Sequence, residues 1–122
     1  YLVEGAPGYV ERMKVSPQEA VVMILEAGGV PCCAHPGKLR DDALLADLIG
    51  VGLRAIEAYH PDHSAAACRF YDRFARKRGL IVTGGSDAHC ISPEHHGGIG
   101  SVTVDRSVID ELKQARQSLL LK

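Results

Sequence analysis

Residues 53–63 read LRAIEAYHPDH, an apolar run that gives way to two histidines. Two similar segments flank it, VPCCAHPG at residues 30–37 and LIVTGGSDAH at residues 80–89. Each apolar run has the length of a strand and stops close to a histidine. The sequence therefore predicts strands over residues 30–34, 53–59 and 80–83. Their carboxyl ends would carry imidazole groups, where α/β folds place reactive side chains.

Helices are predicted before, between and after these strands. Ser16-Pro17-Gln18-Glu19 is a capping box that starts one helix, and Gly28-Gly29 ends it. Asp41 or Asp42 would cap a second helix that Gly50 closes, and a third helix would run from a Ser64 cap to Gly79.

The third predicted helix has an apolar face that consists of Ala67, Phe70, Tyr71 and Phe74. In the first predicted strand, Cys32 and Cys33 are expected to lie in the core. A short fourth strand over residues 101–104 and a last helix over residues 107–121 complete the pattern. This alternation predicts an α/β fold of three to four mostly parallel strands joined by right-handed crossovers, in a single domain of residues 1–122.

Composition limits the function classes. The 122 residues carry a formal net charge of -1, so nothing global indicates binding to nucleic acid or to an anionic membrane. No apolar stretch approaches the roughly 20 residues that cross a bilayer. The four cysteines contain no Cys-x-x-Cys, which favours reduced thiols and a cytoplasmic protein over a disulfide framework.

Asp87 and His89 stand two residues apart after the third predicted strand, behind Gly84 and Gly85. A carboxylate and an imidazole so spaced can reach one metal ion, and this donor mixture suits zinc, manganese or iron better than calcium. The alternative is a capping aspartate beside a surface histidine. Histidines after the other two strands favour the metal site.

His35 follows the first predicted strand, and Lys38 and Arg40 bring positive charge to the same loop. This pattern predicts a third donor at the metal site, with Lys38 and Arg40 binding a phosphate group. A lone histidine is more often a hydrogen-bonded core or loop residue, and the two cations could equally be solvated surface.

His60 and His63 bracket a Pro-Asp turn, so both are expected near one substrate. Each of them could act as a proton donor, a phosphate contact or a metal ligand. Alternatively, one of the pair could serve only in packing. Glu57 interrupts an apolar strand, which is costly unless the carboxylate is paired or used. His95 and His96 fit a solvent-facing loop.

These three segments, taken in order, resemble the later motifs of the PHP (polymerase and histidinol phosphatase) family, and in particular its small phosphoesterases of the nucleoside 3',5'-bisphosphate phosphatase branch. The resemblance runs from about residue 16 to residue 101. It implies a distorted seven-stranded (β/α) barrel with two or three divalent metal ions, Mn, Zn or Fe. It also implies hydrolysis of a phosphate monoester of a nucleotide or other small phosphorylated substrate by metal-activated water.

Within that resemblance, His35, Asp87 and His89 match metal ligands. His60 and His63 match the loop that faces substrate, where an imidazole protonates the leaving oxygen, and Lys38 lies where a phosphate contact is natural.

PHP proteins also open with His-x-His and Ser-Asp-Gly motifs, a glutamate and another histidine, none of which precedes His35 here. We therefore expect a partial barrel, lacking its N-terminal half, that supplies about half of the metal ligands. It would pair with that half or with a second copy. Alternatives are a noncatalytic PHP-like module that binds a partner, and an amidohydrolase-type metal hydrolase that cleaves amides or lactones.

Overall fold

The structure is a computed structural model, and it describes residues 3, 5–10, 14–39, 41–89 and 98–121. Helices and strands alternate along the chain, with one short 3₁₀ helix after the first strand. The elements are α1 (Pro17–Glu26), β1 (Cys32–Cys33), η1 (Pro36–Lys38), α2 (Asp42–Val51), β2 (Ala55–Tyr59), α3 (Ala65–Lys77), β3 (Ile81–Gly84) and α4 (Ser107–Leu120).

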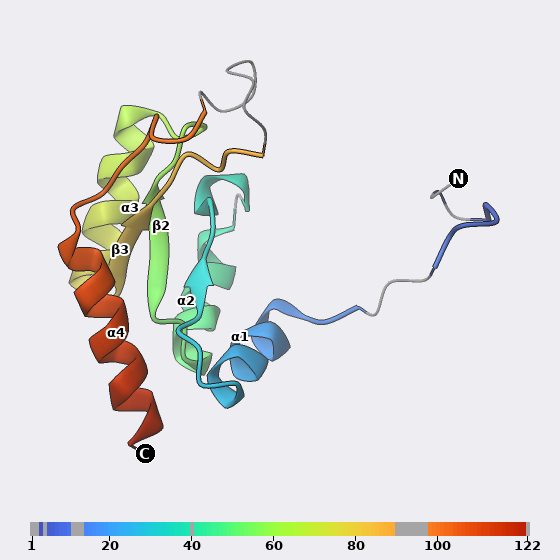
Figure 1. The fold of residues 1–122 in the computed structure, drawn as a ribbon, viewed down its shortest axis with the longest axis horizontal. Helices are drawn as coiled ribbons and strands as arrows, with labels where there is room; N and C mark the ends of the chain where they lie inside the picture. The colour runs from blue at the N-terminus through green and yellow to red at the C-terminus, as the bar shows by residue number, and fades with distance from the viewer. Residues whose placement is uncertain (1–2, 4, 11–13, 40, 90–97, 122) are drawn as a thin grey trace.

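The three strands form one parallel sheet in the order β1-β2-β3, so β2 is central (Figure 1). Cys33 and Val82 both pair with Ile56, and the register between β2 and β3 shifts between Glu57 and Tyr59. Because the strands are parallel, the loops after them meet at one end of the sheet. The predicted α/β class is confirmed, with three strands in the described residues.

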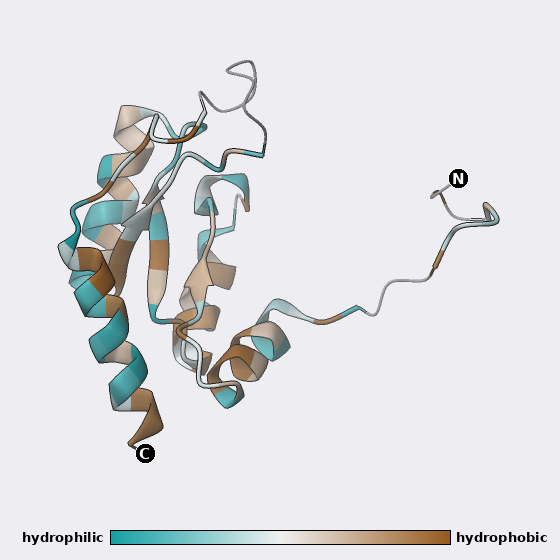
Figure 2. Ribbon diagram, in the orientation of Figure 1, coloured by the Kyte–Doolittle hydropathy of each residue, from teal (hydrophilic) through white to brown (hydrophobic). Residues whose placement is uncertain are grey.

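The core lies where α2 and α3 meet one face of the sheet. Ile56 and Ala58 of β2 are fully buried there against Leu45 of α2 and Ala75 of α3. Because side chains alternate along a strand, Ala55 and Glu57 belong to the opposite face. Figure 2 shows the contrast between the largely hydrophilic ribbon of α4 and the many hydrophobic residues of α1 and α2.

The sheet is curved around β2. Strands two places apart in a flat sheet are separated by about 9.5 Å. Nevertheless Sγ of Cys32 on β1 lies 3.4 Å from Oγ1 of Thr83 on β3. The face that carries these side chains is therefore concave, with Ala55 of β2 at its bottom.

The helix caps explain most of the element boundaries. The hydroxyl of Ser16 accepts the backbone N–H of Glu19, whose carboxylate accepts the N–H of Ser16. Asp41 is the cap of α2 and Ser64 is the cap of α3. The helix α2 continues past the predicted stop at Gly50 and ends at Val51, because the next residue, Gly52, adopts the left-handed conformation, with φ of 116°, that ends a helix.

Three sequence predictions are wrong in detail. Residues 101–104 form no strand. Cys32 is exposed instead of core, since its side chain faces the concave side of the sheet. Phe70 is 43% exposed, because α3 turns Tyr71 and Ala75 toward β2 instead.

Among the described residues, no helix is both long enough and apolar enough to span a bilayer.

Candidate active site

Three loops converge at the carboxyl ends of the strands: residues 34–38 after β1, 60–64 after β2 and 85–89 after β3. Each contains a predicted site residue. Of the non-glycine residues described, His35 and Asp87 alone have positive φ, at 30° and 49°. Positive φ is uncommon for residues other than glycine, and residues that adopt it are often found at functional sites.

His60 is buried beneath these loops, with 2% of its surface exposed. Its Nδ1 accepts the backbone N–H of Asp62 at 3.0 Å, so in the neutral ring the proton is on Nε2. That nitrogen lies 3.3 Å from Oδ2 of Asp87. The hydrogen bond from His60 lowers the pKa of the Asp87 carboxyl, so Asp87 is held ionised.

His63 has the opposite tautomer. Its Nε2 accepts the backbone N–H of Gly37 at 3.1 Å, which leaves the proton on Nδ1, 2.9 Å from the carbonyl oxygen of Ala58. Tyr71 packs against the ring, with the centroids 5.2 Å apart. Both nitrogens of His63 are therefore bonded to backbone groups.

His35 is anchored through its backbone. Its N–H donates to Oε2 of Glu57 at 2.9 Å. The carboxylate that interrupts the apolar strand β2 therefore has a hydrogen-bond partner. The His35 and His60 rings meet edge to face, with centroids 5.4 Å apart. Nδ1 of His35 is buried and forms no hydrogen bond, an arrangement that is costly for an imidazole without a ligand.

His89 lies at the rim of the site. Its Nδ1 is 2.7 Å from the backbone oxygen of Asp87, and 74% of its side chain is exposed. This contact joins Asp87 and His89 within the loop after β3.

Lys38 faces the same end of the sheet, and its Nζ forms an ion pair with Oδ2 of Asp62 at 2.8 Å. The hydrogen bond that Lys38 donates to the Asp62 carboxylate raises the pKa of Lys38, so this side chain stays charged. Both residues line a hollow of about 570 Å³ that reaches Ser64 at the start of α3. Arg40, His95 and His96 lie outside the described residues.

The described residues contain no group of three His, Cys, Asp or Glu side chains already arranged to hold a metal ion. The structure does bring His35, His60 and Asp87 together. His89 joins them through the backbone of Asp87. Sequence reasoning missed the pairing of Asp62 with Lys38, which no short-range spacing rule signals because 24 positions separate the two residues.

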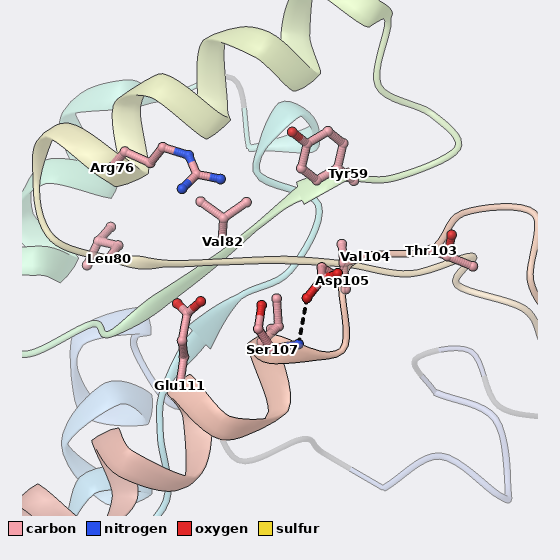
Figure 3. Close-up of a pocket in the computed structure, with 10 residues that line it drawn as sticks. Tyr59, Arg76, Leu80, Val82, Thr103, Val104, Asp105, Ser107 and Glu111 are labelled. Atoms are coloured by element: carbon pink, nitrogen blue, oxygen red, sulfur yellow. Dashed lines mark hydrogen bonds between the residues drawn. The ribbon is translucent and has the colours of Figure 1, made fainter.

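A second hollow, of about 390 Å³, lies beside the sheet between α3 and the start of α4. In Figure 3 Arg76 of α3 and Glu111 of α4 approach it from opposite sides, and Tyr59 lies at its far end. Asp105 accepts the backbone N–H of Ser107 at 2.8 Å there, which fixes the entry into α4 (Figure 3).

Comparison with known proteins shows which proteins this chain resembles. The family profile described as PHP-associated matches residues 66–93. The chain is 43% identical over 75 residues to phosphoribosyl 1,2-cyclic phosphate 1,2-diphosphodiesterase of Eggerthella lenta, covering 62% of this chain and 29% of the relative. It is 34% identical over 94 residues to 3',5'-nucleoside bisphosphate phosphatase of Chromobacterium violaceum, covering 73% and 33%. These matches show a similarity to PHP-associated proteins and to phosphoesterases. The chain spans about a third of the length of these two relatives.

Two solved structures resemble this chain over nearly its whole length. One is a Bifidobacterium adolescentis protein provisionally assigned as a metal-dependent phosphoesterase, with a TM-score of 0.73 and 27% identity over 93% of this chain and 41% of that one. The other is an amidohydrolase from Chromobacterium violaceum with bound sulfate and no metal. Its TM-score is 0.65, with 32% identity over 95% of this chain and 42% of that one.

Proposed function

We propose that the protein containing this chain is a metal-dependent phosphoesterase that hydrolyses a phosphate monoester of a nucleotide or another small phosphorylated substrate. The observation that carries this proposal is the cluster of His35, His60 and Asp87 at the strand ends, with the Lys38 cation facing the same end. The named activities of the two curated relatives support it, since both act on phosphate esters.

We assign His35, Asp87 and His89 as metal ligands. The buried, unbonded Nδ1 of His35 and the ionised carboxyl of Asp87 fit a divalent cation such as Mn, Zn or Fe. A bound cation would supply Lewis acidity and an activated water. Because the described residues form no complete ligand group, the remaining ligands of a site with two or three metals would come from elsewhere in the protein.

The other residues would act on substrate and protons. The proton on Nε2 of His60 lies beside Asp87, where it can orient that carboxylate or protonate a leaving oxygen. Lys38, released from Asp62, and Arg40 would bind phosphate oxygens. The prediction that His63 contacts substrate or transfers a proton remains a prediction, and the hydrogen bonds of His63 favour a different role, developed below.

The concave sheet supports a barrel. A contact between side chains of β1 and β3 across β2 indicates a curved sheet, and curvature is a feature that a closed barrel needs. Both outer strands are paired on one side only within the described residues, so each can accept a further strand. We propose that residues 1–122 are the C-terminal part of a PHP-type barrel, completed by the N-terminal half or by a second copy.

The free thiols of Cys32, Cys33 and Cys68 support a cytoplasmic location for this protein. Its partners would be the small phosphorylated substrate and the chain that completes the barrel, with no membrane among them.

Amide or lactone hydrolysis is a second candidate, because one solved neighbour is described as an amidohydrolase. The sulfate bound to that same neighbour is tetrahedral like phosphate, and this favours phosphate chemistry.

A substrate panel separates the two candidates. The protein extended toward its N-terminus would be assayed with manganese against a nucleoside 3',5'-bisphosphate, p-nitrophenyl phosphate, an acetanilide and a lactone. We expect release of inorganic phosphate that chelation abolishes and manganese restores. Turnover of the acetanilide or the lactone, with none of the phosphate esters, would reject the proposal.

A further inference from the structure

The turn that presents His35 has an unusual hydrogen-bond arrangement. The turn consists of His35, Pro36 and Gly37, and proline has no backbone N–H. The N–H of His35 donates to Glu57 at 2.9 Å, and the N–H of Gly37 donates to His63 at 3.1 Å. Both backbone donors of the turn are therefore taken by side chains from β2 and the loop after it.

The contacts around Gly37 leave little freedom. A Cβ atom at this position would lie 2.8 Å from Nε2 of His63, so glycine permits the close approach. On its other side His63 donates to the carbonyl oxygen of Ala58 at 2.9 Å and packs against the buried ring of Tyr71. The imidazole thus joins the end of β2 to the turn after β1.

His35 needs such support because its backbone is held at φ 30°, ψ 60°. Positive φ costs energy for a residue with a side chain and persists where surrounding contacts fix it. The two side-chain acceptors flank this residue and its proline. They fix the direction in which the His35 ring leaves the backbone, edge to face against His60.

We propose that Glu57 and His63 are positioning residues, which together clamp the His35–Pro36–Gly37 turn and so orient His35 as a metal ligand. This inference rests on the proposed function for its metal, but the clamp itself is a property of the metal-free chain. His63 is on this account neither a ligand nor a proton donor, because both of its ring nitrogens are committed to backbone partners.

The clamp is tested first without metal, by nitrogen-15 NMR of the whole protein at pH 8.5, above the usual imidazole pKa of about 6.5. We expect His63 with its proton on Nδ1, and a coupling across the hydrogen bond between the Gly37 amide nitrogen and Nε2 of His63. A proton on Nε2 of His63 would overturn the proposal.

The second test measures manganese affinity by calorimetry in pairs of matched variants. Asparagine at position 63 can keep the donor to Ala58 but not the acceptor for Gly37, whereas glutamine can reach Gly37. Glu57→Ala removes the acceptor for His35, and Glu57→Gln keeps an amide oxygen there. Glu26→Ala, on the exposed side of α1, is the control.

We expect His63→Asn and Glu57→Ala to weaken manganese binding about 10- to 100-fold, the range typical of outer-sphere partners of metal ligands. His63→Gln and Glu57→Gln should recover most of the affinity, and urea midpoints would be measured for every variant. The clamp would be overturned if Glu57→Ala bound manganese as tightly as Glu57→Gln, and His63→Asn as tightly as His63→Gln. A wild-type protein that binds none of manganese, zinc and iron would instead reject the proposed function, and the NMR result would still decide the clamp.

Discussion

His60 and His63 lie in one loop with ring centroids 5.5 Å apart, yet they carry their protons on different nitrogens. The proton of His60 is on Nε2 beside Asp87, and that of His63 is on Nδ1 beside a backbone oxygen. The tautomer of each ring is set by the backbone N–H that the other nitrogen accepts. Of these two histidines, His60 is therefore the one whose ring proton faces another predicted site residue, Asp87.

A change of His60→Asn is predicted to slow hydrolysis in a way that depends on the leaving group. If His60 protonates the leaving oxygen, kcat for an alkyl phosphate should fall about 100- to 10,000-fold, the usual contribution of a general acid. The loss should be much smaller for p-nitrophenyl phosphate, whose leaving group needs no proton. Steady-state assays with both substrates check this. Equal losses would mean that His60 acts only by holding Asp87.

Substitution of Ile56→Ala should destabilise the chain strongly, because this side chain is fully buried at the centre of β2. The expected loss in free energy of unfolding is about 2–5 kcal/mol, from lost apolar burial and the cavity left behind. Ile109→Ala is the matched control, since Ile109 is 51% exposed on α4. Urea denaturation measures both, and comparable losses would contradict the assignment of the core.

Removal of the Ser64 hydroxyl should weaken the start of α3. That hydroxyl accepts the backbone N–H of Ala67 at 3.1 Å, and loss of such a cap costs about 1 kcal/mol. Ser118→Ala serves as control, because its hydroxyl bonds only within the exposed end of α4. The difference between the two urea midpoints reports the cap, and no difference would argue against it.

The entry into α4 should be sensitive to acid. Hydrogen bonds from Ser107 hold the pKa of the Asp105 carboxyl below its ordinary 3.8. A lowered pKa means that the stabilisation is present above 3.8 and is lost as pH falls through the folded-state value. At neutral pH the urea midpoint of the wild type should therefore be higher than that of Asp105→Asn. The difference between the two midpoints should disappear in acid. A gap that is constant with pH would contradict the assignment.

The order of elements was predictable because the signals are local. The capping box at Ser16, the Asp41 cap and the Ser64 cap each act within four residues, and all three define helix starts in the structure. Residues 101–104 were mistaken for a strand because apolar alternation is a local signal, whereas pairing with a sheet edge depends on tertiary structure.

The site was predictable to the level of its loops, since parallel strands bring their carboxyl ends together. The separate roles of His60 and His63 were not predictable. They depend on which nitrogen receives the N–H of Asp62 or Gly37, and the His63–Gly37 bond joins loops 26 positions apart. Glu57 was recognisable as a residue that needs a partner, but its partner, the backbone of His35, is visible only in the fold.

The most direct test of the account is anomalous diffraction from crystals of the N-terminally extended protein soaked with manganese and phosphate. We predict an anomalous peak within coordinating distance of His35 and Asp87, with His63 bound to Gly37 and not to the metal. A peak elsewhere, or no peak with His35 and Asp87 on separate sides of the molecule, would contradict the central claim that the strand ends form one metal site.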